Sequence, residues 1–84
     1  MFDLEIQALG LRCPLPVLRL NHRIKGLDSG SRVKLICDDV SSLSDVPMFC
    51  ESNGHQIEQV KKEETRNASG GSCIYHFSII KGHK

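Results

Sequence analysis

The chain has 84 residues, a length that supports one domain with a single modest core, and we expect residues 1–84 to form that domain. Hydrophobic residues make up 39% of the chain and charged residues 25%, as is ordinary for a soluble globular protein. The formal net charge of +1 argues against a strongly basic, nucleic-acid-binding domain. No apolar run approaches the roughly 20 residues of a transmembrane helix and no signal peptide is recognisable, so we expect a cytoplasmic protein without membrane contact.

The first half of the chain predicts a strand, a helix and a second strand. Residues 3–8 and residues 32–38 alternate between polar and apolar side chains, as half-buried strands do. Between them, residues 14–28 carry apolar side chains at helical spacing, and Asp-Ser-Gly at 28–30 ends this helix in a turn. The apolar stripe of the helix consists of Val17, Leu20, Ile24 and Leu27, widened by Leu15 and Leu18.

A second helix is expected at about 43–53. Ser41 or Ser42 is its predicted N-cap, and Asp45 lies in its first turn. Pro47 indicates a nearby helix start, because proline is tolerated only in the first turn. The Asn-Gly pair that follows is a typical helix stop.

Two strands are expected at the carboxyl-terminal end. Residues 55–63 form an irregular strand, because Ile57 and Val60 are out of phase, and this favours a β-bulge. Residues 66–72 are rich in glycine and serine and predict a flexible hairpin loop, and residues 73–80 predict the last strand. The order βαβαββ predicts an α/β (α+β) two-layer sandwich, in which two helices cover one face of a four-stranded mixed sheet.

The four cysteines, at positions 13, 37, 50 and 73, are predicted to be free thiols, because the cytoplasm is reducing. The chain contains no Cys-x2-Cys pair. Cys73 and His76 have a ligand-like spacing, but three residues along a strand place two side chains on opposite faces. We therefore expect no metal site.

Cys13 is followed by two prolines, Pro14 and Pro16, and this spacing suits the first turn of a helix. A proline at the first helical position loses nothing, because that N–H has no partner within the helix. Cys13 is therefore predicted to be the N-cap. The N–H groups that remain in the first turn belong to Leu15 and Val17, and either could donate to an anionic sulfur on Cys13.

The expected surroundings of Cys13 favour its thiolate. The helix N-terminus carries a partial positive charge and Arg12 adds a full one, so both lower the pKa of a neighbouring thiol. The loop at Gly10 leaves the sulfur exposed. An exposed thiol of low pKa without a Cys-x-x-Cys partner is suited to carrying a single sulfur atom. The alternative is an N-cap without any chemistry.

The segment LGLRCPLPVLRL resembles the Cys-Pro-x-Pro motif of the TusA/SirA family of sulfur-carrier proteins. CDDVSSLSDVPMFCESNGHQIE is similar to the second block of that family, and FSIIKGHK is similar to its closing strand. The matches run in the expected order from about residue 4 to residue 82. Gln7, where the family often has Asp, and Val40, where it often has Pro, depart from the pattern and bear on partner choice.

The resemblance implies the same fold and a sulfur relay. A cysteine desulfurase or a rhodanese-type donor would place a persulfide sulfur on Cys13, and a downstream acceptor protein would receive it, in many members for tRNA 2-thiouridine formation. Other members serve molybdenum-cofactor biosynthesis or sulfur oxidation. No bound cofactor is implied, because the cargo is covalent, and we expect the free protein to be a monomer. The rival hypothesis is a regulatory or binding module with this fold, in which Cys13 carries no sulfur.

Five further residues are secondary candidates. Cys50 is either a resolving or second accepting thiol or a core cysteine, and the core role is preferred because free cysteines are usually buried. Asp45 is a candidate supporting residue. Asp38 and Asp39 could serve as general acid and base, but capping before a helix is preferred. His55 is either a turn residue or a neighbour of the thiol.

Basic residues cluster around and behind Cys13. They form either a solvated helix face or a docking surface for an acidic partner. The cluster consists of Arg12, Arg19, His22, Arg23 and Lys25.

Overall fold

Six elements follow one another in the predicted order. The computed structural model describes residues 2–12, 15–67 and 70–82, and its strands and helices alternate as βαβαββ. The elements are β1 (Leu4–Ala8), α1 (Leu15–Ile24), β2 (Arg32–Cys37), α2 (Ser42–Ser52), β3 (Gln56–Asn67) and β4 (Gly70–Ile80).

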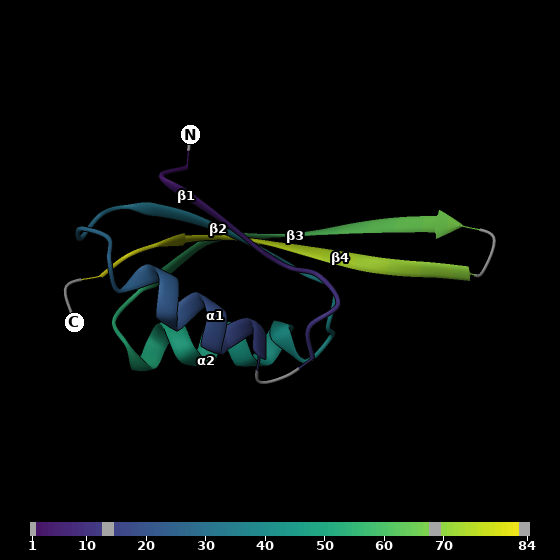
Figure 1. Cartoon of the computed structure of the whole chain (residues 1–84), viewed down its shortest axis with the longest axis horizontal. Coiled ribbons are helices and arrows are strands. Elements are labelled where there is room, and N and C mark those ends of the chain that lie inside the picture. The colour runs from purple at the N-terminus through teal and green to yellow at the C-terminus, as the bar shows by residue number, and fades with distance from the viewer. Residues whose placement is uncertain (1, 13–14, 68–69, 83–84) are drawn as a thin grey trace.

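The four strands form one mixed sheet in the order β1-β2-β4-β3. β1 and β2 pair in parallel, whereas β4 pairs antiparallel with both β2 and β3. Both helices lie on the same side of the sheet, and its other face is left open (Figure 1). This arrangement confirms the predicted two-layer sandwich. Among the described residues, no helix is both long and apolar enough to cross a membrane.

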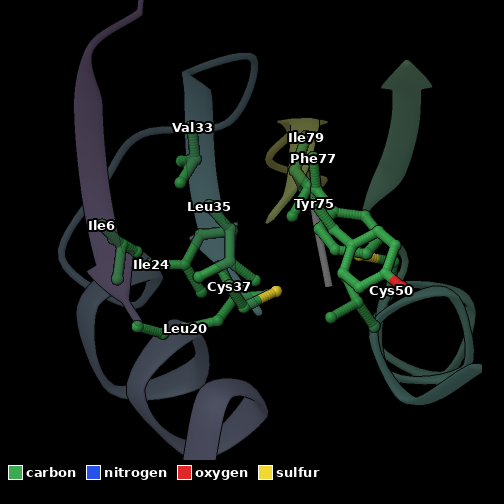
Figure 2. Packing of buried hydrophobic residues seen from close by; sticks show 12 residues of the cluster. Ile6, Leu20, Ile24, Val33, Leu35, Cys37, Cys50, Tyr75, Phe77 and Ile79 are labelled. Atoms are coloured by element: carbon green, nitrogen blue, oxygen red, sulfur yellow. The ribbon is translucent and has the colours of Figure 1, made fainter. Parts of the chain in front are cut away.

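The hydrophobic core fills the space between the sheet and the two helices. Leu20 and Ile24 enter it from α1, Val46 and Cys50 from α2, and Phe77 from β4 is fully buried among them. Figure 2 shows side chains from the strands and the helices converging there. Alternate residues of β1, β2 and β4 face this layer, as the sequence pattern predicts, whereas β3 contributes the partly buried Ile57. The other buried members are Ile6, Ala8, Val33, Leu35, Cys37, Tyr75 and Ile79.

Helix α1 is shorter than predicted. It buries the predicted Leu20 and Ile24 and packs Val17 and Leu27 against the core, but the predicted widening of the stripe is wrong. It ends at Ile24 instead of residue 28, and the Leu27 N–H donates to the Ile24 carbonyl oxygen at 3.1 Å in the turn that follows. Gly26, a poor helix former, lies in that turn. Leu15 and Leu18, expected on the apolar face, are instead 48% and 54% exposed. The buried row consists of Pro16, Leu20 and Ile24, spaced four residues apart.

Helix α2 confirms the predicted boundaries to within one residue, and Ser41 occupies the N-cap position, as predicted. Ser41 makes no side-chain capping bond. Asp39 takes that role: its Oδ1 accepts from the Ser41 N–H at 3.1 Å, and its carbonyl oxygen accepts from the Ser42 hydroxyl at 2.6 Å. Pro47 lies inside the helix, beyond the first turn in which the sequence places it. The helix stops as predicted, with Gly54 in the left-handed conformation (φ 74°).

Strands β3 and β4 form a longer hairpin than the sequence predicts. Where a loop is expected over 66–72, strand pairing continues to Asn67 and Gly70. The backbone hydrogen bonds of the extended ladder outweigh the flexibility of its glycines and serines. β2 pairs with β4 only as far as Tyr75, so the outer ribbon extends beyond the helices (Figure 1). The predicted β-bulge is present in β3, directly after Ile57.

Candidate functional site

The predicted sulfur-bearing residue, Cys13, and its neighbour Pro14 lie outside the described residues, so the site is built from the residues around them. Arg12 precedes them in an exposed loop, and Leu15 follows as the first residue of α1. The loop leaves β1 after Ala8, at the end of the sheet where the parallel strands β1 and β2 have their carboxyl termini. The place of Cys13 at the N-cap, and its support by Pro14, stay predictions.

The first turn of α1 offers fewer free donors than the sequence suggests. The Leu15 N–H donates to the Arg12 carbonyl oxygen at 2.8 Å, which removes it from the donors expected to face the sulfur. Pro16 has no N–H, and its ring is fully buried. Val17, partly buried against the core, is the donor that the prediction for Cys13 retains.

A carboxylate that follows β2 holds the loop before Cys13. Gly10 adopts a φ of 79°, a left-handed conformation that glycine accepts at little cost. Its nitrogen lies 3.0 Å from Asp38 Oδ1 and 3.2 Å from Oδ2, so its N–H donates to that carboxylate. The Leu11 N–H donates to the Ala8 carbonyl oxygen at 3.3 Å and closes the same turn. Asp38 thus tethers a turn, a structural role like the one that the sequence favours over acid–base chemistry.

Acidic groups lie beside Arg12, a juxtaposition that the sequence pattern did not predict. Gly10, Arg12, Asp38 and Asp39 line one hollow of about 300 Å³, together with Val40. A carboxylate disfavours a nearby thiolate, so these acids oppose the effect of Arg12. The signal was available in the strand order: carboxyl ends of neighbouring parallel strands share one edge of a sheet, which brings the residues after β1 and β2 together.

Helix α1 presents a mixed apolar and basic surface to solvent beside the site. Arg19 is held there by donation from its Nη1 to the carbonyl oxygen of Gln7 at 3.1 Å. This contact uses the backbone of Gln7, so it does not depend on the side chain that departs from the family pattern. Three members of the predicted basic cluster therefore lie beside leucines, whereas Arg12 lines a separate hollow. A hollow of about 480 Å³ is lined by Leu11, Leu15, Leu18, Arg19, His22 and Arg23.

The described cysteines belong to the core. Cys50 is 2% exposed, and burial raises the pKa of its thiol to about 11. Cys37 is fully buried, and burial raises the pKa of its thiol although a hydrogen bond with Ser42 acts in the opposite direction. Cys73 is half-buried and packs against the core. A buried thiol of raised pKa is a poor nucleophile, so the structure favours the core role for Cys50 over that of a resolving thiol.

His55 lies at the other end of the molecule from the site. It follows the carboxyl end of α2, and its ring packs on Phe49 with centroids 5.6 Å apart. The Gly82 N–H donates to its Nδ1 at 3.0 Å. Burial, with Lys81 nearby, lowers the pKa of the ring. His55 is therefore a packing residue beside a turn, and not a neighbour of the thiol.

Asp45 and the pair of Cys73 and His76, which were also considered as site residues, do not come together in one site. Asp45 lies in the first turn of α2, as predicted. Cys73 packs against the core, whereas His76 pairs with Glu63 on the open face of the sheet at 2.9 Å. Across residues 2–12, 15–67 and 70–82, no three His, Cys, Asp or Glu side chains gather in a way that could hold a metal ion.

Known proteins share this architecture. The family model described as sulfurtransferase TusA matches residues 4–70. The sulfur carrier protein TusA of Pseudomonas syringae pv. syringae is 39% identical over 62 residues, 74% of each chain, and that of Allochromatium vinosum is 35% identical over 80 residues, 95% of each chain. The crystal structure of a SirA-like protein from Desulfitobacterium hafniense superposes with a TM-score of 0.67 at 26% identity, covering 95% of this chain and 99% of that one. The chain therefore belongs to the TusA family of sulfurtransferases.

Proposed function

We propose that this protein is a sulfur carrier that holds one sulfur atom as a persulfide on Cys13. The observation that carries the proposal is the Cys-Pro-x-Pro motif at the junction of β1 and α1, inside the region that the TusA family model matches. The named relatives are sulfur carrier proteins. The exposure of Arg12 directly before the motif supports access by a protein partner.

The proposed transfer is an exchange between thiols and persulfides. The Cys13 thiolate attacks the outer sulfur of a donor persulfide, so that a new S–S bond forms on Cys13, the donor S–S bond breaks, and the donor cysteine leaves as a thiolate. An acceptor thiolate then attacks the outer sulfur on Cys13, which leaves as a thiolate in turn. Electrons balance in each step, so the proposal requires neither a bound cofactor nor a metal.

Opposing charges set the acidity of the thiol in this proposal. The N-terminus of α1 favours the thiolate by about 0.3–1 kcal/mol, and an exposed pair with Arg12 adds less than about 1 kcal/mol. Asp38 and Asp39 act in the opposite direction. We therefore expect the pKa of Cys13 to lie only modestly below the usual thiol value of about 8.5.

We assign the docking of donor and acceptor to the exposed surface of α1. Leu15 and Leu18 offer apolar contact, and Arg19 and Arg23 offer positive charge around it. Such a surface fits a partner with an apolar centre and an acidic rim. We propose a cysteine desulfurase or a rhodanese-type protein as donor, a second protein as acceptor, and tRNA 2-thiouridine formation in the cytoplasm as the pathway.

Intact mass spectrometry tests the proposal. After incubation with a cysteine desulfurase and cysteine, the wild-type protein should gain one sulfur atom, and Cys13→Ser should gain none. Cys73→Ser is the matched control, because Cys73 packs against the core and should not affect loading. A wild-type protein that gains no sulfur from a desulfurase or from a rhodanese-type donor would contradict the carrier function and favour the binding module.

A further inference from the structure

The hydrogen bond between Gly10 and Asp38 lies three residues before the proposed sulfur-bearing cysteine. We infer that Asp38 is a positioning residue for sulfur transfer: its carboxylate fixes the 9–12 loop against the sheet and thereby fixes the place of Cys13. The inference rests on the proposed function of Cys13 and adds a second residue to that function.

The Asp38 carboxylate connects the two chain segments directly beyond the point where the pairing of β1 and β2 ends. The parallel ladder of β1 and β2 ends at the pair of Ala8 and Cys37. Asp38 bridges this gap, with Oδ1 at 3.0 Å and Oδ2 at 3.2 Å from the Gly10 nitrogen. Because both oxygens lie within reach, either can accept the N–H, and a small rotation of the side chain does not release the loop.

A second hydrogen bond within the described part of the loop is local. It runs from the Leu11 N–H to the Ala8 carbonyl oxygen and joins residues three positions apart, so it shapes the turn without placing it against β2. The bond to Asp38 spans 28 positions and ties the turn to the rest of the fold. Losing it should leave the turn intact but free to shift, and a shift of about 1 Å at a reacting group can lower a rate up to about 100-fold.

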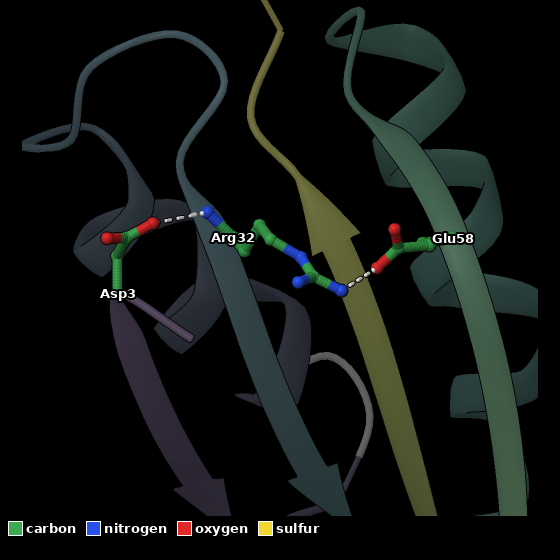
Figure 3. Close-up of polar contacts among 3 residues, drawn as sticks. All are labelled: Asp3, Arg32 and Glu58. Atoms are coloured by element: carbon green, nitrogen blue, oxygen red, sulfur yellow. Dashed lines mark hydrogen bonds and ion pairs between the residues drawn. The ribbon is translucent and has the colours of Figure 1, made fainter. Parts of the chain in front are cut away.

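A comparable carboxylate–amide hydrogen bond lies at the opposite end of the same two strands. Asp3 Oδ2 accepts a hydrogen bond from the Arg32 N–H at 2.8 Å, so it joins the start of β1 to the start of β2 (Figure 3). The chemistry is that of the Asp38 contact, a carboxylate on a backbone amide across the same two strands. Asp3→Ala is therefore a control for the loss of stability that either alanine variant brings.

The experiment compares Asp38→Ala, Asp38→Asn, Asp38→Glu and Asp3→Ala. Asparagine keeps an acceptor at the right distance without the charge, whereas glutamate keeps the charge but moves the acceptor by one methylene. Initial rates of sulfur gain are measured at saturating donor, with urea unfolding in parallel. We expect Asp38→Ala and Asp38→Glu to be about tenfold slower than wild type, and Asp38→Asn and Asp3→Ala to stay within about threefold of it.

Two results would overturn the positioning role. One is an equal decrease in the initial rate of sulfur gain for Asp38→Ala and Asp3→Ala. The other is a higher rate for Asp38→Glu than for Asp38→Asn. If Asp38→Ala does not fold, the order of the Asn and Glu variants decides. A wild-type protein that accepts no sulfur refutes the proposed function separately. Amide hydrogen exchange at Gly10 then tests the tether alone: faster exchange in the Asp38 variant than in Asp3→Ala supports it, and unchanged exchange refutes it.

Discussion

Gly82 passes so close to the turn after α2 that an added methyl group tests this packing directly. A Cβ built on Gly82 would lie 1.7 Å from the Gly54 carbonyl oxygen and 3.2 Å from the His55 nitrogen. Carbon and oxygen atoms that are not bonded cannot approach so closely, so Gly82→Ala must displace backbone. The displacement disturbs two hydrogen bonds, from the Gly82 N–H to His55 Nδ1 at 3.0 Å and from the Ser29 hydroxyl to the Gly82 carbonyl oxygen at 3.2 Å.

These contacts set the size of the expected effect. Each lost hydrogen bond costs about 0.5–1.5 kcal/mol, and forced displacement of packed atoms costs about 1–3 kcal/mol. Alanine recovers about 0.4–1 kcal/mol by restricting the unfolded chain. We therefore expect Gly82→Ala to lower the free energy of unfolding by about 3 kcal/mol.

Urea unfolding followed by circular dichroism measures this change against a control. Gly26→Ala is the control, because no heavy atom lies within 4 Å of the added Cβ. It should leave stability unchanged or raise it by up to about 1 kcal/mol. A Gly82→Ala protein within about 0.5 kcal/mol of wild type would refute the reasoning, since surface changes without a specific mechanism have effects of that size.

Three further predictions address the core and its titrating groups. Leu20 is fully buried, whereas Leu18 is 54% exposed. Leu20→Ala should therefore lower the free energy of unfolding in urea by about 2–5 kcal/mol, and Leu18→Ala by less than about 0.5 kcal/mol. Similar values for the two variants would contradict the packing of α1. Because burial raises the pKa of Cys50 to about 11, only about one thiol in a thousand is ionised at pH 8. Iodoacetamide should therefore label Cys50 in urea but not in the native protein, as peptide mapping would detect. Burial lowers the pKa of His55 in the folded state, so the unfolded state binds this proton more readily. Neutral His55 therefore contributes its full stabilisation above a pH of about 6.5, and this stabilisation is lost as the pH falls below that value. The free energy of unfolding should differ less between pH 7.5 and pH 5.5 for His55→Gln than for wild type.

Side-chain periodicity predicts the order of the elements well, because helices and strands that pack against a core carry their apolar side chains on one face. Alternation along residues 3–8 and 32–38 corresponds to β1 and β2. The edges of the buried stripe on α1 are less determined, since Leu15 and Leu18 suit a position beside Leu20 and Ile24 as well as Pro16 does. Only the packing against the sheet and α2 decides which leucines are buried, and that information is not local.

The length of the hairpin and the contact between Asp38 and Gly10 could not be predicted from the sequence, for a related reason. A stretch rich in glycine and serine favours a loop by local composition, but Asn67 and Gly70 are paired because the two strands extend each other's ladder. Likewise, nothing near Gly10 in the sequence indicates that Asp38 will meet it. That contact follows from the parallel register of β1 and β2, which is fixed by the whole sheet.

Burial of Pro16 gives this one residue two separate roles in the protein. Its ring restricts the backbone at the start of α1, and the same ring fills space inside the protein. A genetic screen for lost sulfur transfer would therefore recover Pro16 variants together with plain folding variants such as those at Leu20. The amount of protein in the cell has to be measured beside its activity before a phenotype at the second proline of the motif is assigned to chemistry.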